Sequence, residues 1–118
     1  MKIAIETLAM ATVVVPEGRL DFGAAPDFQR QIETALAGAN GPPKAVIIDC
    51  AGLDYVSSAG LRVFLVTARA AQRASVSFAL CSLKPAVREV FDLSGFSRVL
   101  AVLADRRAAL AQVSQAAS

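Results

Sequence analysis

Two adjacent serines in the segment DCAGLDYVSSAGLR, residues 49–62, are the residues best placed to do chemistry. The segment leaves a predicted strand and enters a predicted helix, and functional residues of open α/β sheets gather beyond the carboxyl ends of the strands. Serine oxygens at a helix start accept hydrogen bonds from free N–H groups, so Ser57 and Ser58 are candidate caps. Gly60 lies in the first helical turn, where glycine is disfavoured by about 1 kcal/mol relative to alanine, and this points to a close backbone approach. The pattern leaves open a functional site or an ordinary cap followed by a packing glycine.

The remaining inventory excludes several kinds of chemistry. The chain has no histidine, which removes hydrolase triads and histidine-based metal centres. Its two cysteines, Cys50 and Cys81, form neither a CxxC pair nor a zinc spacing, and each closes an apolar run typical of buried core thiols. Neither GxxxxGK[ST] nor GxGxxG is present, so we expect no nucleotide site here. We therefore expect no cofactor, no metal and no enzymatic activity.

Composition limits the class of protein. The chain has 118 residues, of which 55% are hydrophobic and 19% charged, which predicts one globular domain over residues 1–118. No apolar stretch of membrane-spanning length lacks charges, and MKIAIETLAM is typical of a strand rather than a signal peptide. These patterns predict a cytoplasmic protein without a membrane span. A net charge of +2 is too small to indicate a nucleic-acid surface.

The elements that must position the serines follow from hydrophobic periodicity. Strands are predicted at residues 2–6 (half-buried), 11–15, 45–50, 75–81 and 99–103. Helices are predicted at 26–37, 57–73 and 83–93, with a last one capped by Asp105. Residues 51–56 and GANGPP (38–43) are expected to be loops, and Pro16 is expected to end its strand or mark a bulge or an edge. The order predicts an α/β fold with a mostly parallel sheet of four to five strands and about four helices, mainly on one side.

The chain resembles a STAS domain, the family of anti-sigma factor antagonists, over almost its whole length. The segment VVVPEGRLDFGAAPDF resembles the family's Gly-x-Leu-Asp turn into the first helix, and LSGFSRVLAVL resembles its tail. AVIIDCAGLDYVSSAGLRVFL resembles the strand, the aspartate and the Asp-Ser-Ser-Gly-Leu signature. In that family a partner kinase, which is also the anti-sigma factor, phosphorylates the serine after the signature aspartate. The resemblance places that acceptor at Ser58, with Ser57 in place of the acid and Ala59 in place of the second serine. The missing acid makes Ser57 a competing hydroxyl.

The resemblance implies an anti-sigma factor antagonist. The unphosphorylated form is expected to sequester a GHKL-type anti-sigma factor serine kinase, which supplies ATP and Mg²⁺, and thereby to release a sigma factor. Phosphorylation at Ser58 is expected to inactivate the antagonist, and a serine phosphatase is the expected second partner. A monomer is favoured. The alternative function is a STAS subunit that acts as a structural component of a membrane lipid-transport ABC complex.

The expected partner-binding surface gathers residues around the two serines. Its members are Asp21, Phe22, Ser57, Ser58, Gly60, Leu61 and Arg62. Asp21 has a competing role as a cap for the first helix, and Phe22 and Leu61 have a competing place in the core. Arg62 shares a helix face with Arg69 and Arg73, which is either a solvated face or a docking stripe for an acidic partner.

Overall fold

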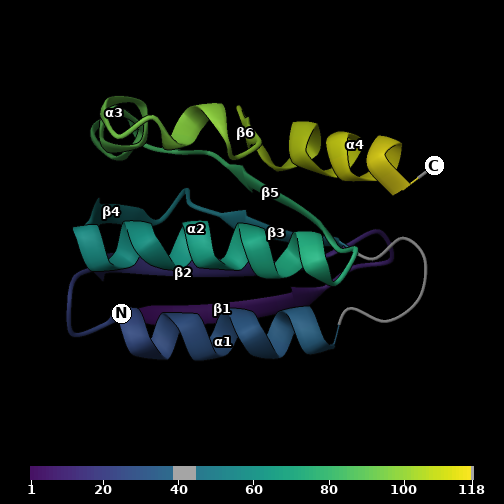
Figure 1. Ribbon diagram of the computed structural model, residues 1–118, viewed down its shortest axis with the longest axis horizontal. Coiled ribbons are helices and arrows are strands. Elements are labelled where there is room, and N and C mark those ends of the chain that lie inside the picture. The colour runs from purple at the N-terminus through teal and green to yellow at the C-terminus, as the bar shows by residue number, and fades with distance from the viewer. Residues whose placement is uncertain (39–44, 118) are drawn as a thin grey trace.

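The computed structural model describes residues 1–38 and 45–117, and it confirms the predicted α/β class. The strands are β1 (Lys2–Thr7), β2 (Thr12–Leu20), β3 (Ala45–Asp49), β4 (Leu53–Val56), β5 (Ser77–Cys81) and β6 (Val102–Leu103). The helices are α1 (Ala25–Ala37), α2 (Ser58–Arg73), α3 (Pro85–Leu93) and α4 (Arg106–Ala117), with a 3₁₀ turn at Phe96–Arg98. Figure 1 shows α1 and α2 running side by side along the sheet.

The sheet runs in the order β1-β2-β3-β5-β6, and β4 pairs separately with β2. Among the described strands only the β1–β2 pair is antiparallel, so the prediction of a mostly parallel sheet is confirmed. The sheet has one strand more than the four to five predicted, because residues 51–56 contain β4 rather than only a loop. The last strand is shorter than predicted and spans only Val102–Leu103.

Strand β2 continues through Pro16, where the sequence predicts an end, a bulge or an edge. The Leu8 N–H donates to the Ala11 carbonyl at 2.9 Å, and the alternation of an antiparallel ladder then turns the Pro16 nitrogen away from β1. That side of β2 pairs with β3 up to Val14 and with β4 only from Gly18. Pro16 thus stands in the gap between two partners, where its missing N–H breaks no ladder bond.

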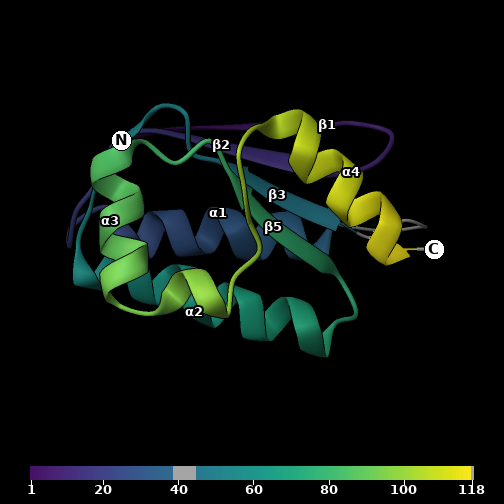
Figure 2. The same ribbon diagram turned by 90° about the horizontal axis from the view of Figure 1, so that it is seen from above.

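Each face of the sheet carries its own core. Helices α1, α2 and α3 cover one face, where three phenylalanine rings are fully buried. Phe64 packs against Phe28 in a tilted arrangement at a centroid distance of 5.4 Å and edge-to-face against Phe91 at 5.2 Å. Helix α4 covers the other face, where Ala109 and Val113 pack in one cluster with β-strand residues. Figure 2 shows the strands between α4 and the α1–α2 pair, so helices lie mainly on one side, as predicted.

Several local predictions have definite outcomes. Cys50 and Cys81 are buried free thiols, and burial raises the pKa of both. Asp105 caps α4, since its Oδ1 accepts from the Ala108 N–H at 2.8 Å. Strand β1 is less buried than predicted, because it is an edge strand whose Ile5 side chain is 40% exposed. The predicted GANGPP loop falls largely on residues 39–44, which lie outside the described residues.

Candidate functional site

The two serines at the start of α2 have different roles. Ser57 is the N-cap: its extended backbone lets Oγ accept from the Gly60 N–H at 3.1 Å. Its own N–H donates to the Leu20 carbonyl at 2.9 Å, which fixes the helix start against the end of β2. Ser58, the first helical residue, is exposed, and its hydroxyl makes no hydrogen bond within residues 1–38 and 45–117. Of the two hydroxyls, the Ser58 hydroxyl is the accessible one.

Gly60 makes this arrangement possible. A Cβ on Gly60 would lie 2.6 Å from Leu20 Cγ and 3.0 Å from the Leu20 carbonyl oxygen. Only a residue without a side chain lets the first turn of α2 come this close to β2. The close backbone approach predicted at this glycine is therefore confirmed, and its partner is Leu20.

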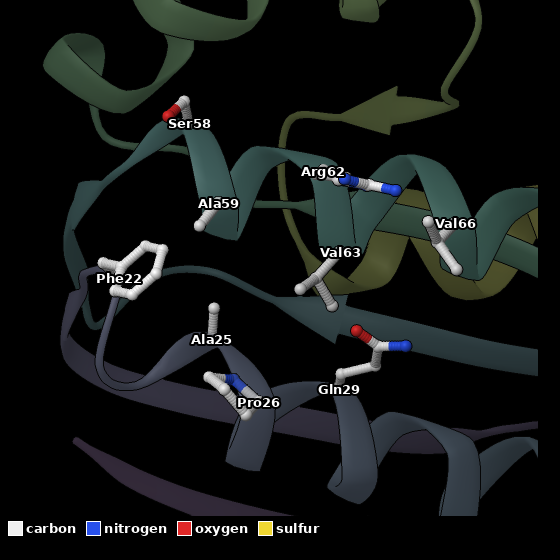
Figure 3. A pocket seen from close by; sticks show the side chains of 9 residues that line it. All are labelled: Phe22, Ala25, Pro26, Gln29, Ser58, Ala59, Arg62, Val63 and Val66. Carbon is white, nitrogen blue, oxygen red and sulfur yellow. The ribbon is translucent and has the colours of Figure 1, made fainter.

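A groove opens between the N-terminal halves of α1 and α2, beside Ser58. It has a volume of about 740 Å³ and is lined by Phe22, Ala25, Pro26, Gln29, Ser58, Ala59, Arg62, Val63 and Val66. Figure 3 shows Phe22 at its end and Gln29 pointing from α1 toward α2. The Phe22 ring is 82% exposed, an unusual state for a large apolar side chain. The groove therefore combines an apolar surface with one free hydroxyl and one cation.

The remaining predicted surface residues separate into exposed and buried groups. Asp21 is exposed, and its Oδ1 accepts from the Ala24 N–H at 2.9 Å, so it caps the turn that leads into α1. Arg62 is also exposed, and in Figure 3 its side chain runs along α2 away from Ser58. The side chain of Leu61 is buried in the core, and Gly60 is buried against Leu20. Asp21, Phe22, Ser58 and Arg62 thus provide the accessible chemistry.

The structure contains an ion-pair cluster on the α4 face that was not predicted from the sequence. Arg106 donates from both terminal nitrogens to the two carboxylate oxygens of Glu6 at 3.0 Å, and from Nε to Asp49 Oδ2 at 2.9 Å. The hydrogen bonds from Arg106 and its positive charge lower the pKa of Glu6. The hydrogen bonds to Glu6 and Asp49, together with their negative charges, raise the pKa of Arg106. Asp49 is the first residue of the segment 49–62 that the sequence analysis selected. Its side chain points to the sheet face covered by α4, opposite α2, and has a structural role there as a partner of Arg106. Asp49 and Glu6 lie 57 and 100 residues from Arg106 in the sequence, so no local sequence pattern could have predicted these contacts.

Two further geometric findings bear on function. In the part of the chain that the structure describes, no three His, Cys, Asp or Glu side chains are grouped so as to hold a metal ion. Within the same residues, no helix has the length and apolar character needed to cross a membrane.

Comparison with known proteins places this geometry in a family. A model of the STAS domain matches residues 2–109. BtrV of Bordetella bronchiseptica, named as a candidate anti-sigma factor antagonist, is 44% identical over 82 residues, which cover 69% of this chain and 71% of BtrV. The crystal structure of an anti-sigma factor antagonist from Mycobacterium paratuberculosis is similar with a TM-score of 0.85 and 23% identity, over 95% of this chain and 92% of that one.

The antagonist SpoIIAA, solved in its unphosphorylated form, shares the same architecture. Its TM-score is 0.77 at 24% identity, and the match covers 95% of this chain and 96% of SpoIIAA. The lipid-transport alternative gains no support from these relatives. BtrV, the relative that shares 44% identity, is named for the antagonist role, and the chain itself belongs to the STAS domain family.

Proposed function

We propose that the protein is an anti-sigma factor antagonist that binds its anti-sigma factor and dissociates from it when Ser58 is phosphorylated. The observation that carries this proposal is the division of roles between two neighbouring hydroxyls. Ser57 Oγ is held by the Gly60 N–H, whereas Ser58 is exposed on the rim of an apolar groove. The antagonist relatives support the regulatory role, and the existence of a named unphosphorylated form of SpoIIAA supports control by phosphorylation.

The groove is the proposed docking surface for the anti-sigma factor. Exposed Phe22 and half-buried Val66 supply apolar contact, and exposed aromatic residues are common anchors of protein interfaces. Arg62 supplies a positive charge at the rim. The partner is a GHKL-type serine kinase that brings its own ATP and Mg²⁺, so this chain contributes only the acceptor hydroxyl. The unmodified chain sequesters the kinase and thereby frees a sigma factor, and a serine phosphatase restores the unmodified form.

Phosphorylation is compatible with the fold. A phosphoryl group adds about −1.5 to −2 charges at pH 7. At the N-terminus of α2 the helix dipole stabilises such a charge by about 0.3–1 kcal/mol. Arg62 lies four residues along the same helix, which is the spacing at which oppositely charged side chains pair. We therefore expect modified and unmodified chains to be equally folded.

The interface with the kinase does not tolerate the same charge. A surface shaped around a neutral hydroxyl loses affinity when a dianion must be desolvated against it. A penalty of about 3 kcal/mol weakens binding roughly a hundredfold, since each 1.4 kcal/mol corresponds to a factor of ten. Release therefore requires no change of shape in this chain.

The test is phosphoryl transfer from the cognate anti-sigma kinase and ATP, read by intact mass and peptide mapping. We expect the chain and its Ser57→Ala variant to gain one phosphoryl group on Ser58, and Ser58→Ala to gain none. Ser57→Ala removes the competing hydroxyl and is the matched control. Equal transfer to both Ser58→Ala and the unaltered chain, or transfer to neither, contradicts the proposal.

A further inference from the structure

Strand β1 leaves one edge of the sheet open. It is the terminal strand in the order β1-β2-β3-β5-β6, and among residues 1–38 and 45–117 it pairs only with β2. Lys2, Ala4, Ile5 and Thr7 are all exposed, and Ile5 is 40% exposed despite being apolar. An exposed edge of this length is a template for a further strand.

The ladder shows which backbone groups are free. The Leu8 N–H points to β2, where it meets the Ala11 carbonyl at 2.9 Å. Backbone groups alternate in direction along an antiparallel pair, so the N–H and C=O groups of Lys2, Ala4 and Glu6 point toward β2. Ile3, Ile5 and Thr7 therefore present their N–H and C=O groups to the open edge.

The strand KIAIET is complementary to itself when a second copy runs antiparallel. Pairing centred on Ala4 places Lys2 opposite the second copy's Glu6, Ile3 opposite its Ile5, and Ala4 opposite its Ala4. In this register the free groups of Ile3 and Ile5 exchange hydrogen bonds, as the ladder requires. Shifting the centre to Ile3 or Ile5 keeps the hydrogen bonds but sets Lys2 against an alanine or a leucine. Only the Ala4-centred register pairs opposite charges.

The charged groups are already in place for this contact. Arg106 holds the Glu6 carboxylate through both oxygens at 3.0 Å, yet the Glu6 side chain remains 43% exposed. Lys2 is exposed and makes no ion pair within the described part of the chain. A net charge of +2 gives little repulsion between two copies.

We propose that two copies of this chain associate through β1, antiparallel and centred on Ala4, to form one continuous sheet. The two-fold axis makes the interface closed, because each Lys2 meets the other copy's Glu6. No residue of β1 lines the groove beside Ser58, so the groove stays open in both copies. This proposal is independent of the function proposed for Ser58, and it replaces the monomer favoured from the sequence.

Cysteine cross-linking of the full chain tests the register. In the proposed dimer the two Ala4 residues form a non-hydrogen-bonded pair with Cα atoms about 4.5 Å apart, a distance that a disulfide spans. The two Lys2 residues are displaced by four positions, about 13 Å along the strand. After mild oxidation we expect Ala4→Cys to double the mass of 12.3 kDa, at least tenfold more completely than Lys2→Cys. Cys50 and Cys81 are buried, so the unaltered chain serves as the blank.

A backbone variant provides the second measurement. Ile5→Pro deletes an N–H that points to the open edge, so the β1–β2 ladder keeps its bonds, as it does at Pro16. Sedimentation equilibrium should show reversible dimers for the unaltered chain and only monomers for folded Ile5→Pro. Equal cross-linking of Ala4→Cys and Lys2→Cys, preferential cross-linking of Ile5→Cys, or a monomer at all concentrations would overturn the proposal. Capture of a different protein by β1 in place of a second copy would overturn it as well.

Discussion

Ser57 and Ser58 are adjacent and chemically identical, yet the fold gives one a structural role and leaves the other free. Replacing Ser57 by alanine removes the acceptor for the Gly60 N–H, and loss of an N-cap costs about 0.5–2 kcal/mol. Ser58→Ala removes an exposed hydroxyl without a protein partner among the described residues, and we expect a change within about 0.5 kcal/mol. Urea unfolding of the two variants measures this difference. Equal destabilisation by both variants would mean that Ser58 also has a structural role.

Gly60 gives a second prediction at this scale. Alanine is about 1 kcal/mol better than glycine inside a helix, so propensity alone predicts stabilisation. The added Cβ would lie 2.6 Å from Leu20 Cγ, and overpacking of this kind typically costs about 1–3 kcal/mol, which outweighs the gain. We expect Gly60→Ala to lower the free energy of unfolding. Gly23→Ala is the matched control, because its Cβ would meet only Asp21 Oδ1 at an ordinary 3.6 Å. A stabilised Gly60→Ala would refute the close-approach argument.

The sequence identified the residues of the site better than their individual roles. It selected both serines and Gly60, because a polar pair before a helical run and a glycine in a first turn are local patterns. It left open which serine is the cap, because that choice depends on the backbone at Ser57 and on the distant Leu20 carbonyl. It also could not separate exposed Phe22 from buried Leu61, since both are apolar residues near the start of a helix.

Among the elements, β4 was missed for a physical reason. The four residues of β4 are buried, exposed, exposed and buried in turn, rather than alternating. The reason is a bulge: Gly18 pairs with Leu53 and Arg19 with Tyr55, so Asp54 has no partner in β2. A four-residue strand with a bulge carries no period of two. Long amphipathic helices such as α1 and α2 carry a strong period and were located within one residue at each end.

Helix α4, β1 and β3 are joined by Arg106, and this junction predicts a pH dependence. Hydrogen bonds from Arg106 lower the pKa of Glu6 in the folded chain. A carboxylate with a lowered folded pKa contributes stability above its unfolded pKa and loses it as the pH falls through the folded value. We therefore expect Glu6→Gln to reduce stability at pH 7 and to have progressively less effect as the solution is acidified below the ordinary range of glutamate.

Urea unfolding of the Glu6 variant at several pH values checks this linkage. Glu89→Gln is the control, because Glu89 is exposed on α3 and makes no ion pair within the described residues. Its substitution should leave the free energy of unfolding nearly unchanged at every pH. An effect of Glu6→Gln that does not vary with pH would show that the carboxylate charge is not what stabilises the junction.

At the scale of the whole molecule, the sheet separates two tasks. One face, under α4, holds the Arg106 junction, and the other carries α1 and α2 with the groove between them. The open edge at β1 lies apart from the groove, and its Glu6 belongs to the Arg106 junction. Substitutions of exposed residues in the groove should therefore affect partner binding without affecting stability.

Phe22 and Leu93 test this separation, because both side chains are 82% exposed and only Phe22 lines the groove. Truncating an exposed side chain removes little burial, so both alanine variants should unfold within about 0.5 kcal/mol of the unaltered chain. An aromatic anchor at an interface is worth more than about 1 kcal/mol. Phe22→Ala should then weaken binding of the cognate anti-sigma kinase about tenfold or more in calorimetric titration. Leu93→Ala should bind like the unaltered chain, since α3 contributes nothing to the groove. If the two variants bind equally well, the docking surface lies elsewhere, and the exposure of Ser58 loses its connection to partner release.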